Sequence, residues 1–450
     1  MESVNKKILF GAGTISIGAF ISKLLGAIYR IPLTNILGGE GIGLYQLVFP
    51  VYCLLLDFSS AGAPNAISKL VSSENEENGY KIFKTSLKIF SLLGVVGSII
   101  LFIFSKPIAI LQGNKNAFLG FIFISPAVFA VSILACFRGY FQGKFNMKIT
   151  AVSQAIEQLV KLLIGLAVAY AFRFNIVYAV AGATFAVSVA EFVALIYAYT
   201  KYKRHKKTFG IGYIYEKTDY NKYSKQILKT ALPITLIGIF IPLSQFVDSF
   251  LIVNLLGKYT VNSTALYGLY SGSALTLINL PISLLLGFST VAVPSVSGAK
   301  TKLEREKKIA VVLLFTLILG IVFAFATNFF SRFAVNILYK GLSNTEREIT
   351  VKLVKLGSAN IVLLSLLQTE NSILIGSGKT FLSLIGMSIG VVVKIALEIV
   401  LLSNPKINIY GASIALIACY FVASLVNLIL VKKGGTKLAN KTYCPKKLNN

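Results

Sequence analysis

Long apolar stretches alternate with short polar ones over almost the whole chain. About twelve apolar segments are each about 20 residues long, which is enough for a helix to cross a hydrocarbon core of about 30 Å. Helices are expected because lipid leaves no partner for an unpaired backbone group. The pattern therefore predicts an all-α polytopic membrane protein. The segments lie near 8–31, 43–67, 86–105, 117–138, 149–172, 176–200, 228–256, 267–294, 308–330, 353–376, 381–402 and 408–431.

Polar residues recur at helical spacing inside the first two segments, which a glycine-rich turn joins. Lys23 and Arg30 share one face of the first segment, and Gln46 and Asp57 share one face of the second. A charge at membrane depth costs about 2.5–3.5 kcal/mol per residue, so such side chains usually face an interior cavity. We expect this hairpin to line a polar path through the bilayer.

Arg30 allows two interpretations. A guanidinium in an apolar cavity suits phosphate or diphosphate, which it binds through paired hydrogen bonds. Alternatively, Arg30 reaches the membrane interface, because it precedes Pro32 near the end of the segment. Lys23 lies nearly two turns deeper and cannot easily reach that interface. The depth of Lys23 favours a cavity role for both cations, and we take the two as candidate diphosphate-binding residues.

Further segments also carry charged and amide side chains. Glu157 and Lys161 stand at i and i+4 on the fifth segment, the spacing of an intrahelical ion pair. They form either a structural pair between bundle helices or part of a polar wall that touches sugar hydroxyls. Gln245 and Asp248 share a face of the seventh segment and are further candidates for the cavity. Buried carboxylates are candidates for proton or cation coupling, and these are Asp57, Asp248 and Glu370.

The second half of the chain repeats the first. Each half holds six of the segments, an even number, so both halves enter the membrane from the same side. This predicts two parallel-repeat six-helix bundles around a central cavity. Three elements recur about 230 residues later: GAPNAISK (62–69) as AVPSVSGA (292–299), Gly143 and Lys161 as Gly376 and Lys394, and GATFAVSVAEFVA (182–194) as GASIALIACYFVA (411–423).

The repeat sets the expected domain boundaries. The predicted parts are an N-terminal bundle over 1–200, a basic cytoplasmic linker over 201–227, a C-terminal bundle over 228–432 and a basic tail over 433–450. Prolines concentrate in the first, second, seventh and eighth segments. A proline leaves a backbone carbonyl free, which cavity water or a neighbouring helix must satisfy. These four segments are therefore expected to line the cavity.

Composition and charge agree with a membrane protein. Hydrophobic residues make up 55% of the 450 residues and charged residues only 14%, where soluble domains carry about 25%. The net charge is +27. With the N-terminus inside, cytoplasmic loops hold roughly thirty Lys and Arg and external loops about ten, a strong positive-inside bias. Both termini are thus predicted to be cytoplasmic, with anionic membrane lipids rather than nucleic acid as partners of the basic loops.

The sequence carries no sign of catalysis. Four scattered cysteines and one histidine give no metal or disulfide spacing. The GxxxxGK[ST], HExxH and GxSxG motifs are absent. We therefore expect no enzyme activity, no cofactor and no metal site. Transport would draw on the membrane potential, an ion gradient or the gradient of the substrate.

A family resemblance appears at GAIYRIPLTNILGGEGIGLYQLVFPVY, followed by SSAGAPNAISKLVSSE. Here the chain resembles the stage V sporulation protein B-like, polysaccharide-transporter branch of the MOP (MATE-like) flippase superfamily, which is related to the lipid II flippases. The resemblance implies flipping of an undecaprenyl-diphosphate-linked saccharide, with Arg30 at the position of a diphosphate-binding arginine. The chain differs from the lipid II flippases in two places. Ile31 stands where those proteins commonly have an acidic residue, and the eighth segment, around Tyr267–Ser273, contains no arginine.

Three functions remain open at this point. The first is a flippase for a lipid-linked saccharide, such as lipid II, in the bacterial cytoplasmic membrane, with envelope-synthesis enzymes as candidate partners. The second is a cation-coupled multidrug exporter on the same fold, which would need Asp57, Asp248 or Glu370. The third is a scaffold for envelope or spore-coat assembly. A scaffold needs no charge inside its spans, which favours the first two functions.

Overall fold

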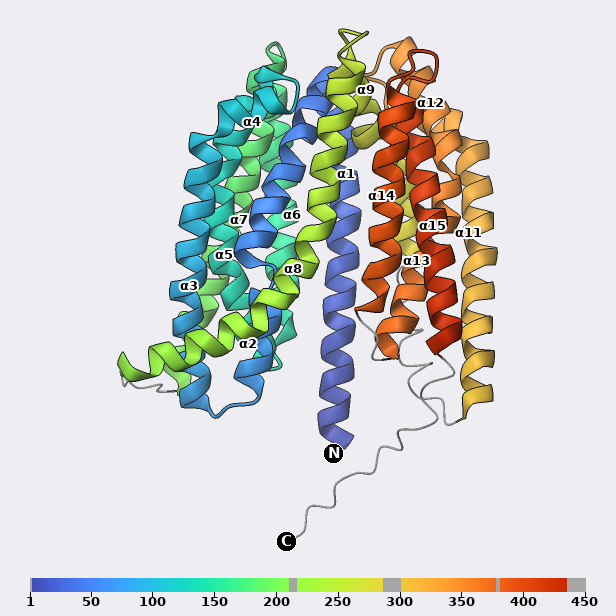
Figure 1. The fold of residues 1–450 in the computed structure, drawn as a ribbon. Coiled ribbons are helices and arrows are strands. Elements are labelled where there is room, and N and C mark those ends of the chain that lie inside the picture. The colour runs from blue at the N-terminus through green and yellow to red at the C-terminus, as the bar shows by residue number, and fades with distance from the viewer. Residues whose placement is uncertain (1, 210–216, 286–300, 378–380, 435–450) are drawn as a thin grey trace. The chain divides into compact units, whose positions relative to one another are not determined.

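The structure is a computed structural model that describes residues 2–209, 217–285, 301–377 and 381–434, with side chains of the first helix from Leu24 onward. Over these ranges the chain forms helices joined by short turns, and no strand is present (Figure 1). The prediction of an all-α membrane protein is confirmed. The second copy of the GAPNAISK motif, at 292–299, lies outside the described residues.

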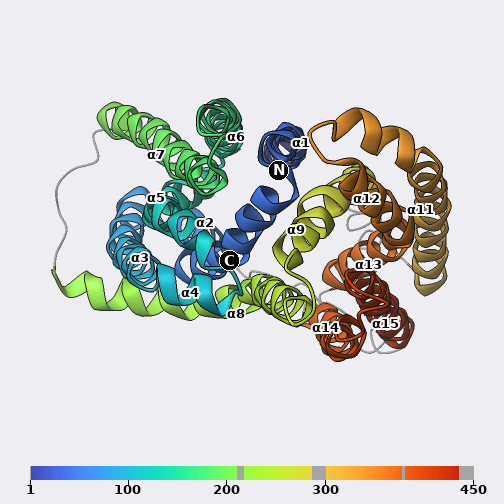
Figure 2. The same ribbon diagram turned by 90° about the horizontal axis from the view of Figure 1, so that it is seen from above.

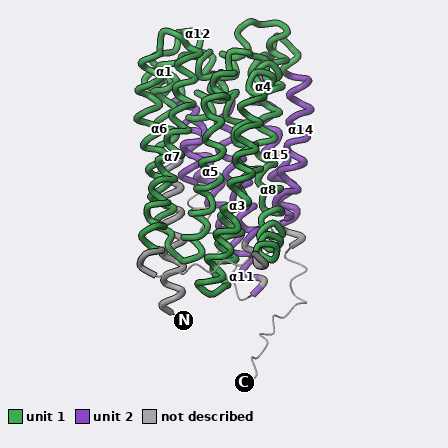
Figure 3. The backbone as a smooth tube through the Cα atoms, turned by 90° about the vertical axis from the view of Figure 1, so that its left-hand side faces the viewer, with its two compact units in different colours: residues 1–277, 331–353, 402–409 green, residues 278–330, 354–401, 410–450 purple. Residues whose placement is uncertain are grey.

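The chain divides into two compact units, which are coloured in Figure 3: residues 1–277, 331–353 and 402–409 form unit 1, and residues 278–330, 354–401 and 410–450 form unit 2. The predicted bundle boundaries stay a prediction. Unit 1 holds α1 (Glu2–Ser60), α2 (Ala63–Ser72), α3 (Glu76–Ile103), α4 (Ser105–Leu111), η1 (Lys115–Ala117), α5 (Phe118–Gly143), α6 (Met147–Ala171), α7 (Ile176–Phe209), α8 (Lys217–Leu256), α9 (Ser263–Tyr267) and η2 (Gly268–Ala274). Unit 2 holds α13 (Ala359–Gly376), α15 (Tyr410–Gly434) and α14 (Leu382–Leu402) up to its last residue, while α11 (Lys302–Leu338) and α12 (Asn344–Gly357) contribute to both units.

The number of membrane spans agrees with the prediction of about twelve. Within the described residues, ten helices are long and apolar enough to cross a membrane, and the bent pair Asn344–Gly357 and Ala359–Ile375 makes an eleventh span. One of the ten, Leu24–Ser72, runs across a break at Gly38. Counting the two sides of this break separately gives the twelfth span.

The glycine-rich turn of the first hairpin is a break at one residue. Gly38 has φ 67° and ψ −174°, a conformation that glycine adopts freely and that other residues rarely reach. The chain rises from the N-terminus to this point and then returns towards α2, as Figure 1 shows. Pro32 and Pro50 lie inside α1 on either side of the break. The predicted hairpin is therefore present, with Arg30 two turns before its bend.

The basic segment after Thr200 is more helical than its composition suggested. Helix α7 continues through the lysine-rich run to Phe209, and α8 begins at Lys217. Helices therefore cover both ends of the segment that was predicted as a linker over 201–227. Lysine and arginine are good helix formers, and each apolar span continues directly into the basic residues, so its helix can extend beyond the hydrocarbon.

An aromatic core holds the helices of unit 1 together near this basic segment. Phe83 of α3, Tyr140 of α5 and Tyr202 of α7 are buried with ring centroids 4.7 to 5.9 Å apart. Their edge and tilted contacts are the favoured geometry for aromatic pairs. They fix the packing of α5 against α7.

Hydrogen bonds join α1 to distant parts of unit 1 near its bend. The Asn35 amide nitrogen donates to the Leu338 carbonyl at 2.7 Å, and the Gly341 N–H donates to the Asn35 side-chain oxygen at 2.9 Å. The Tyr339 hydroxyl donates to the Ser273 carbonyl at 3.0 Å. The Gln46 amide donates to the Ser271 hydroxyl at 3.2 Å. The bonds of Asn35 and Gln46 thus hold α1, near its bend, to residues more than 200 positions away in the sequence.

Candidate functional site

A group of polar side chains lies among α1, α5, α6 and α7 of unit 1. Helix α6 packs against both α1 and α7, and α7 packs against α5. Figure 2 shows α6 and α7 side by side, viewed along the helices. Most residues of these helices are apolar, so each polar side chain between them needs a partner. We call Arg138, Ser153, Glu157, Gln158, Lys161 and Glu191 the polar cluster.

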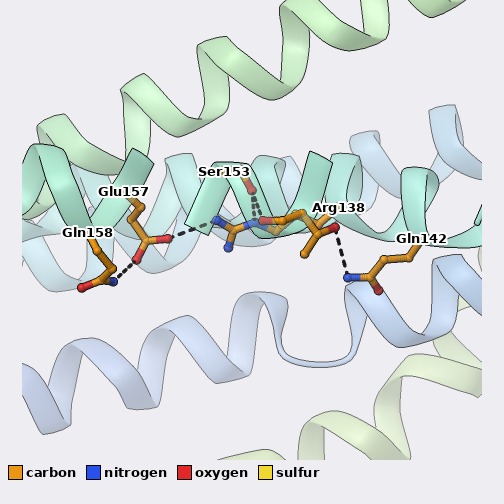
Figure 4. Close-up of polar contacts among 6 residues, drawn as sticks. Arg138, Gln142, Ser153, Glu157 and Gln158 are labelled. Carbon is orange, nitrogen blue, oxygen red and sulfur yellow. Dashed lines mark hydrogen bonds and ion pairs between the residues drawn. The ribbon is translucent and has the colours of Figure 1, made fainter. Parts of the chain in front are cut away.

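An ion pair between two helices forms the centre of the polar cluster. An Arg138 guanidinium nitrogen lies 3.1 Å from a Glu157 carboxylate oxygen, and the two side chains are only 14% and 18% exposed (Figure 4). Arg138 also donates from Nε to the Ser153 hydroxyl at 2.9 Å. The Gln158 amide donates to the other Glu157 oxygen at 3.0 Å. Both charges are therefore held by several hydrogen bonds, which a buried ion pair requires.

This arrangement replaces the predicted pair between Glu157 and Lys161. Glu157 acts on Lys161 through its charge but forms its ion pair with Arg138, although the i, i+4 spacing allows a pair with Lys161. The Lys161 ammonium lies 5.7 Å from the ring centroid of Tyr29 on α1, a cation–π distance. The sequence identified both ends of the network but paired them wrongly, because spacing along one helix does not reveal Arg138 on the neighbouring helix.

Glu191 is a member of the polar cluster that the sequence analysis did not single out. Its side chain on α7 is 5% exposed, and its Oε2 has no hydrogen-bond partner among the described residues. It lies within electrostatic range of Glu157, Arg138 and Lys161. The available signal was a lone acidic residue inside the apolar motif GATFAVSVAEFVA.

Arg30 is half-buried and faces the interior of unit 1. Its charge acts on Lys161, on the buried Tyr45 and on Cys53, which lie on α6 and on the second part of α1. Among the described side chains, no ion pair or hydrogen bond engages its guanidinium. This placement supports the cavity interpretation over the interfacial one. The side chain of Lys23, its predicted companion, lies outside the described residues.

The other predicted cavity residues are dispersed. Gln46 is 5% exposed, and its side chain makes the hydrogen bond to Ser271 described above. Asp57 is half-buried and faces α8, where a Cβ added at Gly238 would lie 3.8 Å from its carboxylate. On α8, Asp248 is half-buried and Gln245 is exposed. The structure thus places Asp57 opposite α8 but brings neither Gln245 nor Asp248 into the polar cluster.

Unit 2 contains a separate buried network. Glu370 of α13 is fully buried and accepts a hydrogen bond from the Ser424 hydroxyl of α15 at 2.7 Å. The Asn427 amide donates to the Asn371 oxygen at 2.8 Å. Within the ranges that the structure covers, no three His, Cys, Asp or Glu side chains come close enough to hold a metal ion. Glu370 belongs to unit 2, whereas the other two coupling candidates belong to unit 1.

Comparison with known proteins gives matches over most of the chain. Residues 8–300 match the family described as polysaccharide biosynthesis protein. The lipid II flippase MurJ of Bacillus subtilis (strain 168) is 24% identical over 467 residues, covering 96% of this chain and 83% of the relative. Stage V sporulation protein B of the same organism is 28% identical over 445 residues, covering 95% and 82%.

Solved structures give the same result at the level of the fold. An inward-facing MATE multidrug resistance transporter of the MOP superfamily superposes with a TM-score of 0.75 at 14% identity, covering 92% of this chain and 94% of that chain. A structure of the lipid II flippase MurJ in an inward closed conformation gives 0.73 at 16% identity, covering 94% and 88%. The resemblance expected from the first hairpin is confirmed, and so is the predicted fold class.

Proposed function

Because the chain belongs to the polysaccharide biosynthesis protein family, we propose that it is a flippase that moves a lipid-linked saccharide across the cytoplasmic membrane. The chain is a multi-pass membrane protein whose relatives are named as transporters and flippases, not as enzymes. The proposed cargo is an undecaprenyl-diphosphate-linked saccharide, which moves from the inner to the outer leaflet. Lipid II is one such cargo, named for a relative that is 24% identical.

One observation carries the proposal. Arg30 lies within an apolar span, faces the interior of unit 1 and meets no counter-charge among the described side chains. An unpaired guanidinium at membrane depth is unfavourable until an anion binds it. A diphosphate supplies this anion and accepts paired hydrogen bonds from the planar guanidinium. The saccharide itself would meet polar side chains along the same path.

The proposed orientation in the membrane is argued from the charge distribution. The excess of Lys and Arg in alternate loops supports an orientation with both termini in the cytoplasm. The basic ends of α7 and α8 then lie at the inner surface, where anionic lipids attract them. Envelope-synthesis enzymes would deliver the saccharide carrier at this surface. Asp57, Asp248 and Glu370 stay candidates for coupling transport to an ion gradient.

Depletion of the protein in its bacterial host tests the proposed function. Lipid extracts from depleted cells, measured by mass spectrometry, should show a lipid-linked saccharide accumulating. Arg30→Ala should reproduce the accumulation at wild-type membrane levels, because the diphosphate loses its cation. Lys148→Ala is the control, since Lys148 is exposed at the start of α6. An unchanged pool of every lipid-linked saccharide after depletion would contradict the proposal.

A cation-coupled multidrug exporter is the second candidate. The fold similarity to a MATE transporter and the carboxylates inside the spans favour it. This function predicts that expression lowers the accumulation of cationic dyes and that Asp57→Asn or Glu370→Gln abolishes the effect. Dye levels that do not respond to expression, together with a stalled lipid-linked saccharide on depletion, would reject it.

A further inference from the structure

We propose that Lys161 is a second cation of the diphosphate site, beside Arg30, and that Arg138 keeps Lys161 available by holding Glu157. This inference rests on the proposed function, because it assigns residues to the same substrate. It replaces a site built on α1 alone by one shared between α1 and α6. Arg138 then acts as a positioning residue that does not itself touch the ligand.

The first step is the proximity of the two cations. The Lys161 ammonium lies 5.7 Å from the Tyr29 ring centroid, and Tyr29 directly precedes Arg30 on α1. The positive charge of Arg30 also acts on Lys161. Two positive groups on neighbouring helices, both half-buried, repel each other in the absence of a ligand. A ligand with two adjacent negative groups removes this repulsion.

The second step is that Glu157 forms its ion pair with Arg138 and not with Lys161, although the charges of Glu157 and Glu191 both act on Lys161. Glu157 stands one turn away on α6 and would ordinarily pair with Lys161. Instead Arg138 takes one Glu157 oxygen at 3.1 Å and Gln158 takes the other at 3.0 Å. Ser153 holds Arg138 in place at 2.9 Å, as Figure 4 shows. Both oxygens of Glu157 are therefore occupied, and none of the described carboxylates forms an ion pair with Lys161.

The third step concerns the chemistry of the ligand. The face of the Tyr29 ring stabilises the ammonium only weakly compared with an anion. An ammonium is a compact point charge and a guanidinium is a planar fork, so the two suit neighbouring phosphates of one diphosphate. A monophosphate would engage only one of them fully. The chemistry shared by all such ligands is phosphate, which a prenyl diphosphate, free pyrophosphate or a phospholipid headgroup each supplies.

Binding to the purified full-length chain in detergent tests the proposal, with farnesyl diphosphate as the probe. Lys161→Met removes the charge and keeps the length of the side chain, and should weaken binding about tenfold or more. Lys161→Arg keeps the charge and should stay within about threefold of wild type. Lys148→Met, on the same helix but exposed, should bind as wild type does.

Three competitors separate the sources of phosphate. Inorganic pyrophosphate should displace the probe, whereas farnesyl monophosphate should do so about tenfold less well, because it lacks the second phosphate. In Lys161→Met this preference for diphosphate should disappear. Phosphatidylglycerol that displaces the probe as well as pyrophosphate does would overturn the proposal, since the site would then recognise lipid headgroups.

The role of Arg138 is tested by a rescue. Arg138→Met should weaken probe binding, because it releases Glu157 to pair with Lys161. The double variant Arg138→Met, Glu157→Gln should regain binding, because the Glu157 carboxylate is then removed, while Glu191 is the same in every variant. In a Lys161→Met background, Arg138→Met should change binding no further, which a merely structural role of Arg138 would not predict. Thermal unfolding of each variant confirms that it is folded.

The outcomes separate the two proposals. In one outcome, wild type and Lys161→Met both bind the probe and Arg30→Ala does not. The role of Lys161 is then overturned, while the proposed function stands. If Lys161→Met fails to fold, the comparison of Arg138→Met with its double variant still decides whether Glu157 competes for Lys161. If wild type binds neither farnesyl diphosphate nor pyrophosphate, the diphosphate site itself is overturned.

Discussion

The two copies of the internal repeat use the same set of helices in different ways. In unit 1, α5, α6 and α7 enclose the polar cluster, and in unit 2 the corresponding helices are α13, α14 and α15. The shift that pairs Gly143 with Gly376 and Lys161 with Lys394 also pairs Ser153 with Gly386 and Glu157 with Gly390. Ser153 and Glu157, which accept the hydrogen bonds of Arg138 in the first copy, thus correspond to glycines in the second copy.

The glycines let the helices of unit 2 approach closely. A Cβ added at Gly390 would lie 2.5 Å from the Cys419 carbonyl oxygen of α15, and one at Gly386 would lie 2.7 Å from the Ala423 oxygen. The counterpart of Arg138 is Asn371, which accepts a neutral hydrogen bond from Asn427. The second copy is therefore packed against backbone at these two positions and lacks a counterpart of the pair between Arg138 and Glu157, although Lys394 and Glu398 of α14 are buried there. The diphosphate site is expected only in the first copy.

The largest expected effect on stability comes from breaking the ion pair of the first copy. Arg138→Met leaves the Glu157 carboxylate without its cation at low exposure and should destabilise the protein by about 2–4 kcal/mol. Thermal or chemical unfolding in detergent measures the loss. Arg138→Met with Glu157→Gln should recover most of it. A single variant as stable as wild type would show that the network does not hold the helices.

A smaller loss is expected from adding a side chain in the second copy. Gly390→Ala places a Cβ against the α15 backbone and should cost about 1–3 kcal/mol, because a packed interface must separate. Gly26→Ala is the matched control, since its nearest neighbour would be the Gln158 oxygen at 3.7 Å. Equal stability of the two variants would contradict the close approach of α14 to α15.

The smallest effect is expected at the counterpart of Arg138. Asn371→Ala removes one neutral hydrogen bond to Asn427 and should cost about 1 kcal/mol, less than Arg138→Met. The same unfolding measurement compares the two substitutions. A loss at Asn371 as large as that at Arg138 would mean that the two copies do not differ in the way described.

The sequence predicted the fold well because the fold depends on segment length and hydropathy. Twelve spans, the hairpin broken near Gly38 and the parallel repeat follow from apolar periodicity and self-similarity alone. The pairing inside the polar cluster could not be predicted from the sequence. Two cations, Lys161 on the same helix and Arg138 on a neighbouring helix, compete for Glu157. Glu191 was missed because a single acidic residue has no spacing pattern. Helix neighbours, which decide both cases, cannot be read from one segment.

The most direct test of the central claim is a cryo-electron microscopy structure of the full chain with bound farnesyl diphosphate. Phosphate oxygens are predicted at about 2.7–3.2 Å from the Lys161 ammonium and from the Arg30 guanidinium. Arg138 should still hold Glu157 in that structure. Diphosphate density away from both cations, or a Lys161 ammonium paired with the Glu157 carboxylate while the ligand is bound, would contradict the claim.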